Sequence, residues 1–146
     1  MIEYAAPGKA VIWGEYAVLE GAPALVMAVN RYAEARVRSA DDLWRLTSAG
    51  FESAAALTVN ELMEIETSEA QGVAGLIRAV LAALGDPPLP RGAAIHTDTR
   101  HFHTQPGGAG EVQKLGIGSS AAVCTATCAA IAEFLDREFD ASQPLT

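Results

Sequence analysis

A glycine-rich segment in the last third of the sequence has the composition of a phosphate-binding loop. It runs Lys114-Leu115-Gly116-Ile117-Gly118-Ser119-Ser120 and leads into an alanine-rich stretch. Glycines let the backbone adopt a positive φ beside a bulky anion, and the first N–H groups of a following helix have no intrahelical partner. Ser119 and Ser120 add hydroxyls, one able to cap the helix and one able to contact a phosphate oxygen or a Mg²⁺ ion. With the cation of Lys114 beside them, Gly116, Gly118 and the serines predict a phosphate-binding site.

The same pattern also fits a less specific role. Ser119 can be only a helix N-cap and the glycines only a flexible turn, because loops of this composition are common. The segment is not a Walker A loop, since no Gly-Lys-Ser/Thr follows the glycines, and it lacks the third glycine of a dinucleotide fingerprint. Spacing alone leaves both interpretations open.

Two segments together resemble motifs of one kinase family. KLGIGSSAAV, residues 114–123, is similar to the second motif of the GHMP kinases, usually written with GLGSSAA at its centre. Residues 6–9 (APGK) and 14–19 (GEYAVL) resemble the first motif of the mevalonate-pathway branch, PGKxxxxGEYAVL. Two motifs in the family order are more specific than either motif alone.

This resemblance implies an ATP-dependent small-molecule kinase. In the family the second motif wraps the ATP phosphates, which assigns Gly116, Gly118, Ser119 and Ser120 to the triphosphate and Ser120 to Mg²⁺. The lysine of the first motif maps onto Lys9, beside the transferred phosphoryl group, where a cation stabilises the charge that develops during transfer. Without the surrounding motif, Lys9 would be an ordinary solvated turn lysine.

The acceptor is expected to be phosphomevalonate or mevalonate, a small-molecule substrate. The KxGxGSS form of the loop resembles phosphomevalonate kinases, which favours the phosphorylated acceptor. Family members place acceptor contacts near the first motif, so Tyr16 and Arg31 are candidate substrate residues, although Arg31 fits a strand-end surface position equally well. Glu15 is expected to anchor the turn at Gly14.

A second basic segment could help to bind a phosphorylated acceptor. Arg100, His101 and His103 lie ahead of the loop and could supply cations, or they could belong to a solvated loop. His101 and His103 make a weak metal pair, because no third ligand is evident and Mg²⁺ prefers oxygen.

The resemblance covers only the amino-terminal part of such a kinase. The family's catalytic aspartate, acidic Mg²⁺ ligand and third glycine-rich motif would lie beyond Thr146, and Asp98, Asp136 and Asp140 stand in no matching context. We therefore expect residues 1–146 to form one ATP-binding domain without the carboxy-terminal GHMP domain, and to be inactive alone. The alternative is a nucleotide-binding module or half of a split kinase, completed by self-association or by a partner chain.

Composition sets limits on these hypotheses. The chain has 146 residues, 50% of them hydrophobic, and a net charge of -8 with ten Lys and Arg, which argues against a nucleic-acid surface. It contains neither an apolar run long enough for a membrane span nor a signal-peptide pattern at its start, so we expect a cytoplasmic protein. Cys124 and Cys128 fit packing residues of a helix better than a zinc site or a disulfide.

The elements that would position the loop follow from periodicity. Residues 2–6 and 10–13 predict two strands or one bent strand, and residues 24–38 a half-exposed strand. Residues 42–47 predict the next antiparallel strand, 69–84 an amphipathic helix, 92–98 a strand, and 119–139 a helix with an apolar, buried first half. This order predicts an α+β two-layer domain of sheet and helices, like the amino-terminal domain of the GHMP kinases.

Overall fold

One five-stranded sheet organises the chain in a computed structural model that describes residues 1–50, 53–66, 71–104 and 112–138. Its strands are β1 (Ile2–Trp13), β2 (Leu25–Ser39), β3 (Trp44–Ala49), β4 (Ser53–Leu57) and β5 (Ala93–Asp98), in the order β1-β2-β5-β3-β4. β5 is antiparallel to β2 and parallel to β3, and the other neighbouring pairs are antiparallel. The sheet is therefore mixed.

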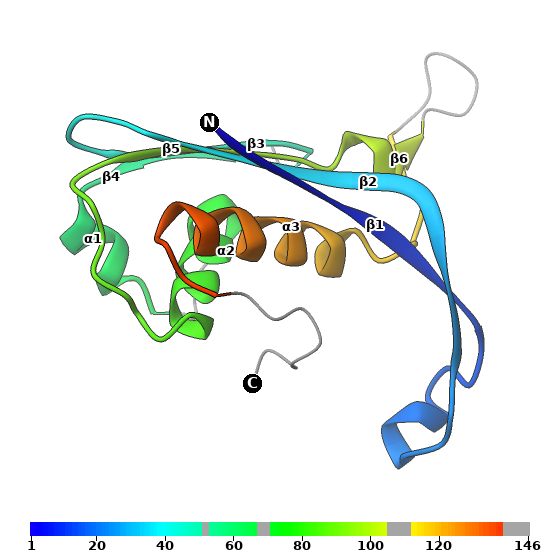
Figure 1. The fold of residues 1–146 in the computed structure, drawn as a ribbon. Coiled ribbons are helices and arrows are strands. Elements are labelled where there is room, and N and C mark those ends of the chain that lie inside the picture. The colour runs from blue at the N-terminus through cyan, green and yellow to red at the C-terminus, as the bar shows by residue number, and fades with distance from the viewer. Residues whose placement is uncertain (51–52, 67–70, 105–111, 139–146) are drawn as a thin grey trace.

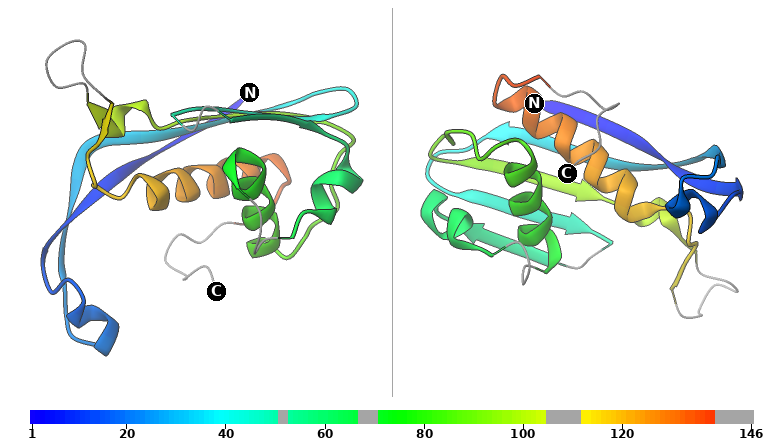
Figure 2. Two further views of the ribbon diagram at one scale, coloured as in Figure 1. Left: turned by 180° about the vertical axis from the view of Figure 1, so that it is seen from behind. Right: turned by 90° about the horizontal axis from the view of Figure 1, so that it is seen from below.

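The helices α1 (Val59–Glu64), α2 (Gly72–Ala83) and α3 (Ser119–Phe134) lie on one face of this sheet (Figures 1 and 2). Side chains alternate between the faces of a strand, so Ala33, Ala35 and Val37 of β2 are buried against the helices while the residues between them face outward. The predicted α+β two-layer architecture is confirmed.

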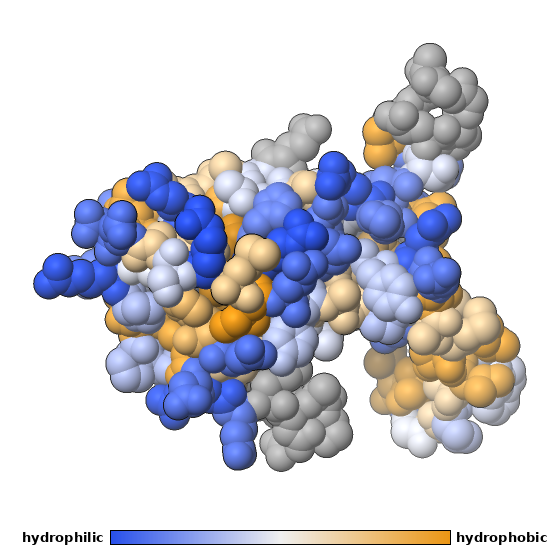
Figure 3. All heavy atoms as spheres, turned by 45° about the horizontal axis from the view of Figure 1, so that its top comes forward, coloured by the Kyte–Doolittle hydropathy of each residue, from blue (hydrophilic) through white to orange (hydrophobic). Residues whose placement is uncertain are grey.

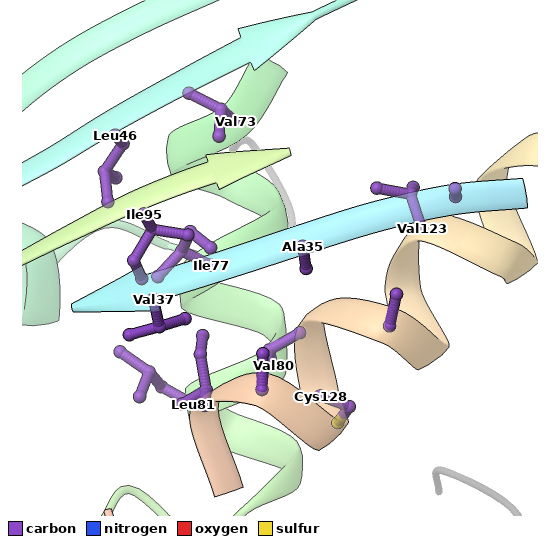
Figure 4. Close-up of a cluster of buried hydrophobic side chains, with 14 of the residues drawn as sticks. Ala35, Val37, Leu46, Val73, Ile77, Val80, Leu81, Ile95, Val123 and Cys128 are labelled. Atoms are coloured by element: carbon purple, nitrogen blue, oxygen red, sulfur yellow. The ribbon is translucent and has the colours of Figure 1, made fainter. Parts of the chain in front are cut away.

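The core lies between the two layers. Val37, Leu46 and Ile95 of the sheet meet Ile77 and Val80 of α2 and side chains of α3 (Figure 4). At one end of this core the buried Trp44 indole donates a hydrogen bond to the Pro90 carbonyl at 3.1 Å and packs edge-on against Phe134 at a centroid distance of 6.5 Å. Burial of these side chains is the main stabilising term of the fold.

Residues 9–32, called the arm below, extend away from this layered part, which we call the body (Figure 1). The arm contains the distal halves of β1 and β2 and the 3-10 helix η1 (Ala17–Glu20), and none of its residues is buried. Its surface is largely hydrophobic, as Figure 3 shows. The exposed large apolar side chains are Val11, Ile12, Trp13, Tyr16, Val18, Leu19, Leu25, Val26, Met27 and Tyr32.

Several details differ from the sequence-based expectations. Residues 2–13 form one bent strand. The strand predicted at 42–47 exists as β3, but it lies between β4 and β5, so the prediction that it would be next to β2 is wrong. β4 and α1 were not predicted. The helix predicted at 69–84 begins at Gly72, and α3 ends at Phe134. Glu69, Phe139 and Asp140 lie outside the described residues.

Candidate phosphate-binding site

The two sequence motifs meet where the arm leaves the body. The backbone N–H of Lys9 donates a hydrogen bond of 2.9 Å to the carbonyl of Ile117, inside the glycine-rich loop. A Cβ at Gly8 would lie 2.6 Å from that same carbonyl oxygen and 2.6 Å from Cε1 of Phe102. The close approach therefore requires glycine at position 8, and it places Lys9 against the loop.

The loop ends at a helix N-terminus whose amides are open. Gly118 is the N-cap of α3 with φ 76° and ψ 32°, and no side chain caps the helix. The first helical bond runs from the Ala122 N–H to the Gly118 carbonyl at 3.0 Å. Among the described residues, the amides of Ser119, Ser120 and Ala121 have no acceptor. An anion at this terminus would be stabilised by these N–H groups and by the helix dipole.

The two serines occupy different environments. Ser119 is buried and Ser120 is exposed. The interpretation of Ser119 as the N-cap is wrong, because Gly118 takes that position in a left-handed conformation that glycine adopts without strain. Gly116 is also left-handed, and a Cβ there would meet nothing within 4 Å. The loop is thus open on the side of Gly116 and Ser120.

A small two-stranded sheet adjoins the loop. η2 (Arg100–Phe102) leads into β6 (His103–Thr104), which pairs with β7 (Gln113–Lys114), and the Leu115 N–H donates to the Phe102 carbonyl at 2.9 Å. Phe102 is fully buried. Sequence reasoning missed Phe102, whose one signal was an aromatic residue within a polar segment. Lys114 is exposed at the entrance to the loop.

In the basic segment before the loop, the positive charge of Arg100 is partly neutralised by Asp98. The Arg100 Nε lies 3.0 Å from both carboxylate oxygens of Asp98, and the Arg100 N–H donates to the same carboxylate at 2.9 Å. These bonds, chiefly the side-chain bond from Arg100, hold the pKa of Asp98 below its usual value. The guanidinium is therefore already bound, which weakens Arg100 as a phosphate ligand.

The histidines of that segment do not gather with other ligands. Nδ1 of His103 lies 3.2 Å from the Thr99 carbonyl, and His101 is exposed. Within the described ranges, no three His, Cys, Asp or Glu side chains come together as a metal site.

The two candidate substrate residues lie in different places. The register between β1 and β2 shifts after Pro7, which pairs with Tyr32, while Gly8 pairs with Val29. Asn30 and Arg31 are the extra residues of this bulge, so Arg31 lies across from the first motif. Tyr16 is exposed at the far end of the arm and has a φ of 61°. The part of β1 from Lys9 to Trp13, which spans about 13 Å, separates Tyr16 from the loop.

The turn that contains Tyr16 is held by main-chain bonds. The carbonyls of Gly14 and Glu15 accept from the N–H groups of Val18 and Ala17 at 3.0 and 2.7 Å. The anchoring role expected of Glu15 is thus filled by its backbone carbonyl.

The residues present fit a nucleotide triphosphate better than they fit a complete Mg²⁺ site. Open amides, two left-handed glycines and two lysines suit phosphate oxygens. For Mg²⁺, the loop itself offers the exposed Ser120 hydroxyl, whereas protein Mg²⁺ sites ordinarily add one or two carboxylates.

A scan against protein-family models finds no match, and a search of curated proteins finds none either. Solved structures do match. A crystal structure of mevalonate kinase has a TM-score of 0.74 at 21% identity, covering 96% of this chain and 42% of its own. Methanococcus jannaschii mevalonate kinase gives 0.75 at 21% identity, with 95% and 42% covered. Streptococcus pneumoniae phosphomevalonate kinase, in complex with phosphomevalonate and AMPPNP, gives 0.67 at 23%, with 96% and 39% covered.

The chain thus spans about two fifths of the length of these enzymes. Among the helices that the structure describes, none is long and apolar enough to cross a membrane. The similarity inferred from the two motifs is confirmed at the level of the fold. Over its described residues, this chain has the α+β fold of the amino-terminal domain of the GHMP kinases, with mevalonate kinase and phosphomevalonate kinase among its structural neighbours.

Proposed function

We propose that this chain is the ATP-binding part of a GHMP-type kinase that transfers the γ-phosphoryl group of ATP to phosphomevalonate or mevalonate. The observation that carries the proposal is the 2.9 Å hydrogen bond from the Lys9 amide to the Ile117 carbonyl. This bond brings the lysine of the first motif to the helix N-terminus of the second, as phosphate binding with charge stabilisation requires. The phosphomevalonate complex of one neighbour supports a phosphorylated acceptor.

Each residue of the site has a separate task in this proposal. The amides of Ser119, Ser120 and Ala121 hold the phosphate oxygens of ATP, and the Ser120 hydroxyl would be a ligand for Mg²⁺, which would neutralise phosphate charge. Lys9 stabilises the transferred phosphoryl group, and Lys114 adds a cation at the entrance. These local charges are needed because the chain as a whole carries -8. Arg31 is retained as an acceptor contact, because the bulge places it beside Gly8. Tyr16 reaches the acceptor only if the acceptor extends along the arm.

A second candidate function is a nucleotide-binding module, or one half of a split kinase, without activity of its own. Two observations favour it. The chain covers about two fifths of its neighbours' length, and the arm exposes apolar side chains that a partner surface would cover. We propose that the 146 residues alone bind nucleotide but show negligible turnover, because neither a catalytic base nor an acidic Mg²⁺ ligand has been assigned within them.

The test is a coupled ADP-release assay on the longest chain that the gene encodes, with Mg-ATP and mevalonate, phosphomevalonate, homoserine or galactose. We expect turnover with phosphomevalonate or mevalonate, and a loss of about 10²–10³ in kcat for Lys9→Ala, as is usual when a group that stabilises transition-state charge is removed. Ser120→Ala should also lower turnover. Arg91→Ala, an exposed cation outside the loop, should not.

Each outcome assigns a role. Retained ATP binding without turnover on any acceptor would favour the binding module. Full activity in Lys9→Ala would remove the proposed role of Lys9, and turnover by the 146-residue chain would refute its predicted inactivity.

A further inference from the structure

A hollow of about 380 Å³ lies on the face of the sheet opposite the helices. Three arginines line it, Arg36 and Arg38 from β2 and Arg45 from β3, together with Thr47 and His96. Figure 3 looks onto this outer face and shows hydrophilic side chains gathered over it. Lys9 and Ser120 are not among the lining residues, so the hollow is separate from the glycine-rich loop.

The strand register explains the hollow. Ala94 of β5 pairs with Arg38 on one side and with Arg45 on the other, so the three residues form one row across the sheet. Adjacent strands lie about 4.8 Å apart, so the Cα atoms of the two arginines are about 10 Å apart. Only the methyl group of Ala94 stands between them. Two long cationic side chains therefore flank a gap that a small residue leaves empty.

The three arginines of this hollow differ in whether they form ion pairs with carboxylates. Arg36 is bonded to Glu3 at 3.1 Å and to Glu34 at 2.8 Å. Among the described residues, no carboxylate lies within salt-bridge distance of Arg38 or Arg45. Arg38 and Arg45 therefore give the hollow a local positive charge, although acidic residues outnumber basic ones 18 to 10 in the chain as a whole.

In the neighbouring row of the sheet, a hydrogen bond orients the ring of His96. Arg36 and Thr47 pair with His96 from either side. The Thr47 hydroxyl donates to the Ile95 carbonyl at 3.2 Å, and the same oxygen lies 2.9 Å from Nδ1 of His96, within hydrogen-bond distance. The imidazole is thus oriented, with Nε2 as its remaining polar atom.

We propose that this hollow binds a phosphorylated small molecule, with its phosphate group held by Arg38 and Arg45 above Ala94. A guanidinium binds oxyanions as a planar fork, and a carboxylate has only two oxygens, both in one plane, to share between two forks. The terminal oxygens of a phosphate point in several directions and can serve two forks from opposite sides. The volume is that of a small-ligand site. The inference does not depend on the proposed kinase activity.

The test follows the backbone amides of the 146-residue chain by ¹⁵N NMR during titration with inorganic phosphate and with glycerol 3-phosphate. We expect saturable shifts at Ala94, His96 and Thr47, which are distinct in concentration dependence from any shifts at residues 119–121. Arg38→Gln and Arg45→Gln should each weaken the binding at Ala94 by about tenfold, as is typical of the loss of a charge-assisted bond. Ala94→Leu should abolish that binding by filling the gap.

Two controls make the result decisive. Arg137→Gln removes the same charge from an exposed arginine just beyond α3, in the helix layer, and should leave the binding at Ala94 unchanged. Succinate, a dicarboxylate, should bind more weakly than glycerol 3-phosphate. The proposal is overturned if saturable shifts appear only at residues 119–121, if Arg137→Gln weakens binding as much as Arg38→Gln, or if succinate binds equally well.

Discussion

The body and the arm each contain one of the two tryptophans of the chain. Trp44, the first residue of β3 in the body, is fully buried, with its indole N–H bonded and its ring against Phe134. Trp13 of the arm is 64% exposed. The same side chain therefore contributes a large burial term in one region and little in the other.

This difference shows that two kinds of interaction hold the two regions. The body is held by apolar side chains that pack between the sheet and the helices. The arm is held by backbone pairing between β1 and β2 and by its contact with the loop at Lys9. Its apolar side chains are available for contacts with another surface. Four predictions test this contrast, in order of decreasing effect on the free energy of unfolding.

The largest effect is expected from the paired substitutions Trp44→Ala and Trp13→Ala. Removing the buried ring should cost about 3–5 kcal/mol, because it leaves a cavity and an unpaired Pro90 carbonyl. Removing the exposed ring should change stability by less than about 0.5 kcal/mol. Urea unfolding monitored by circular dichroism measures both, and similar losses in the two variants would contradict the contrast.

Gly8→Ala tests the junction between the regions. The added methyl group would overlap the Ile117 carbonyl and the Phe102 ring, which should cost about 1–3 kcal/mol. It should also shift the amide signals of residues 116–120 in an NMR spectrum. Gly21→Ala, at the arm's far end, is the control for the NMR signals and should leave them in place, because a Cβ there meets nothing within 4 Å. Its φ of 80° makes alanine unfavourable at that position, so stability is not compared between the two variants.

The pair of Asp98 with Arg100 gives a smaller, pH-dependent effect in the body. Because folding lowers the pKa of Asp98, the pair stabilises the fold above the unfolded pKa of about 4, and this contribution is lost as the pH falls through the folded value. Arg100 is largely exposed, so solvent screening keeps this contribution small. Between pH 7 and pH 3, Asp98→Asn and Arg100→Ala should each lose less stability than the wild type. Parallel profiles of stability against pH for all three proteins would show that the pair makes no such contribution.

Leu19→Lys in the arm should have the smallest effect on stability, less than about 0.5 kcal/mol. Leu19 is 79% exposed, and replacing it removes apolar surface that we expect to associate with another chain. Sedimentation velocity at high concentration should show less association for this variant. Glu20→Gln makes the same change of net charge on the same 3-10 helix, and equal loss of association in both variants would assign the effect to charge.

Local patterns predicted much of the fold. Alternation along β2 and helical spacing along α2 depend on neighbouring residues, so both elements were found from the sequence. The position of β3 beside β5 depends on a pairing between distant residues, which periodicity does not contain. β4 (SAAAL) lacks the β-branched and aromatic residues that mark strands. The capping box of Thr58 and Glu61 did mark the start of α1, and could have been used.

The candidate site was predictable in its parts and less so in its geometry. The motifs pointed to Lys9 and to the loop, and the structure places them in contact. The bulge that places Arg31 across from Gly8 arises from a register shift between two strands, which no local pattern reveals. The hydrogen bond from Leu115 in the loop to the Phe102 carbonyl likewise joins residues that are distant in sequence, so no local pattern reveals it.

The position of β5 in the sheet also orders events during synthesis of the chain. When the first 60 residues have left the ribosome, β1 can pair with β2 and β3 with β4, because both pairs are close in sequence. These two hairpins share no ladder until β5, some thirty-five residues after β4, enters between them. Such distant pairings slow folding, since a long loop must close before any bond forms. The nascent chain therefore holds two separate hairpins, with open edges on β2 and β3, until one late strand joins them.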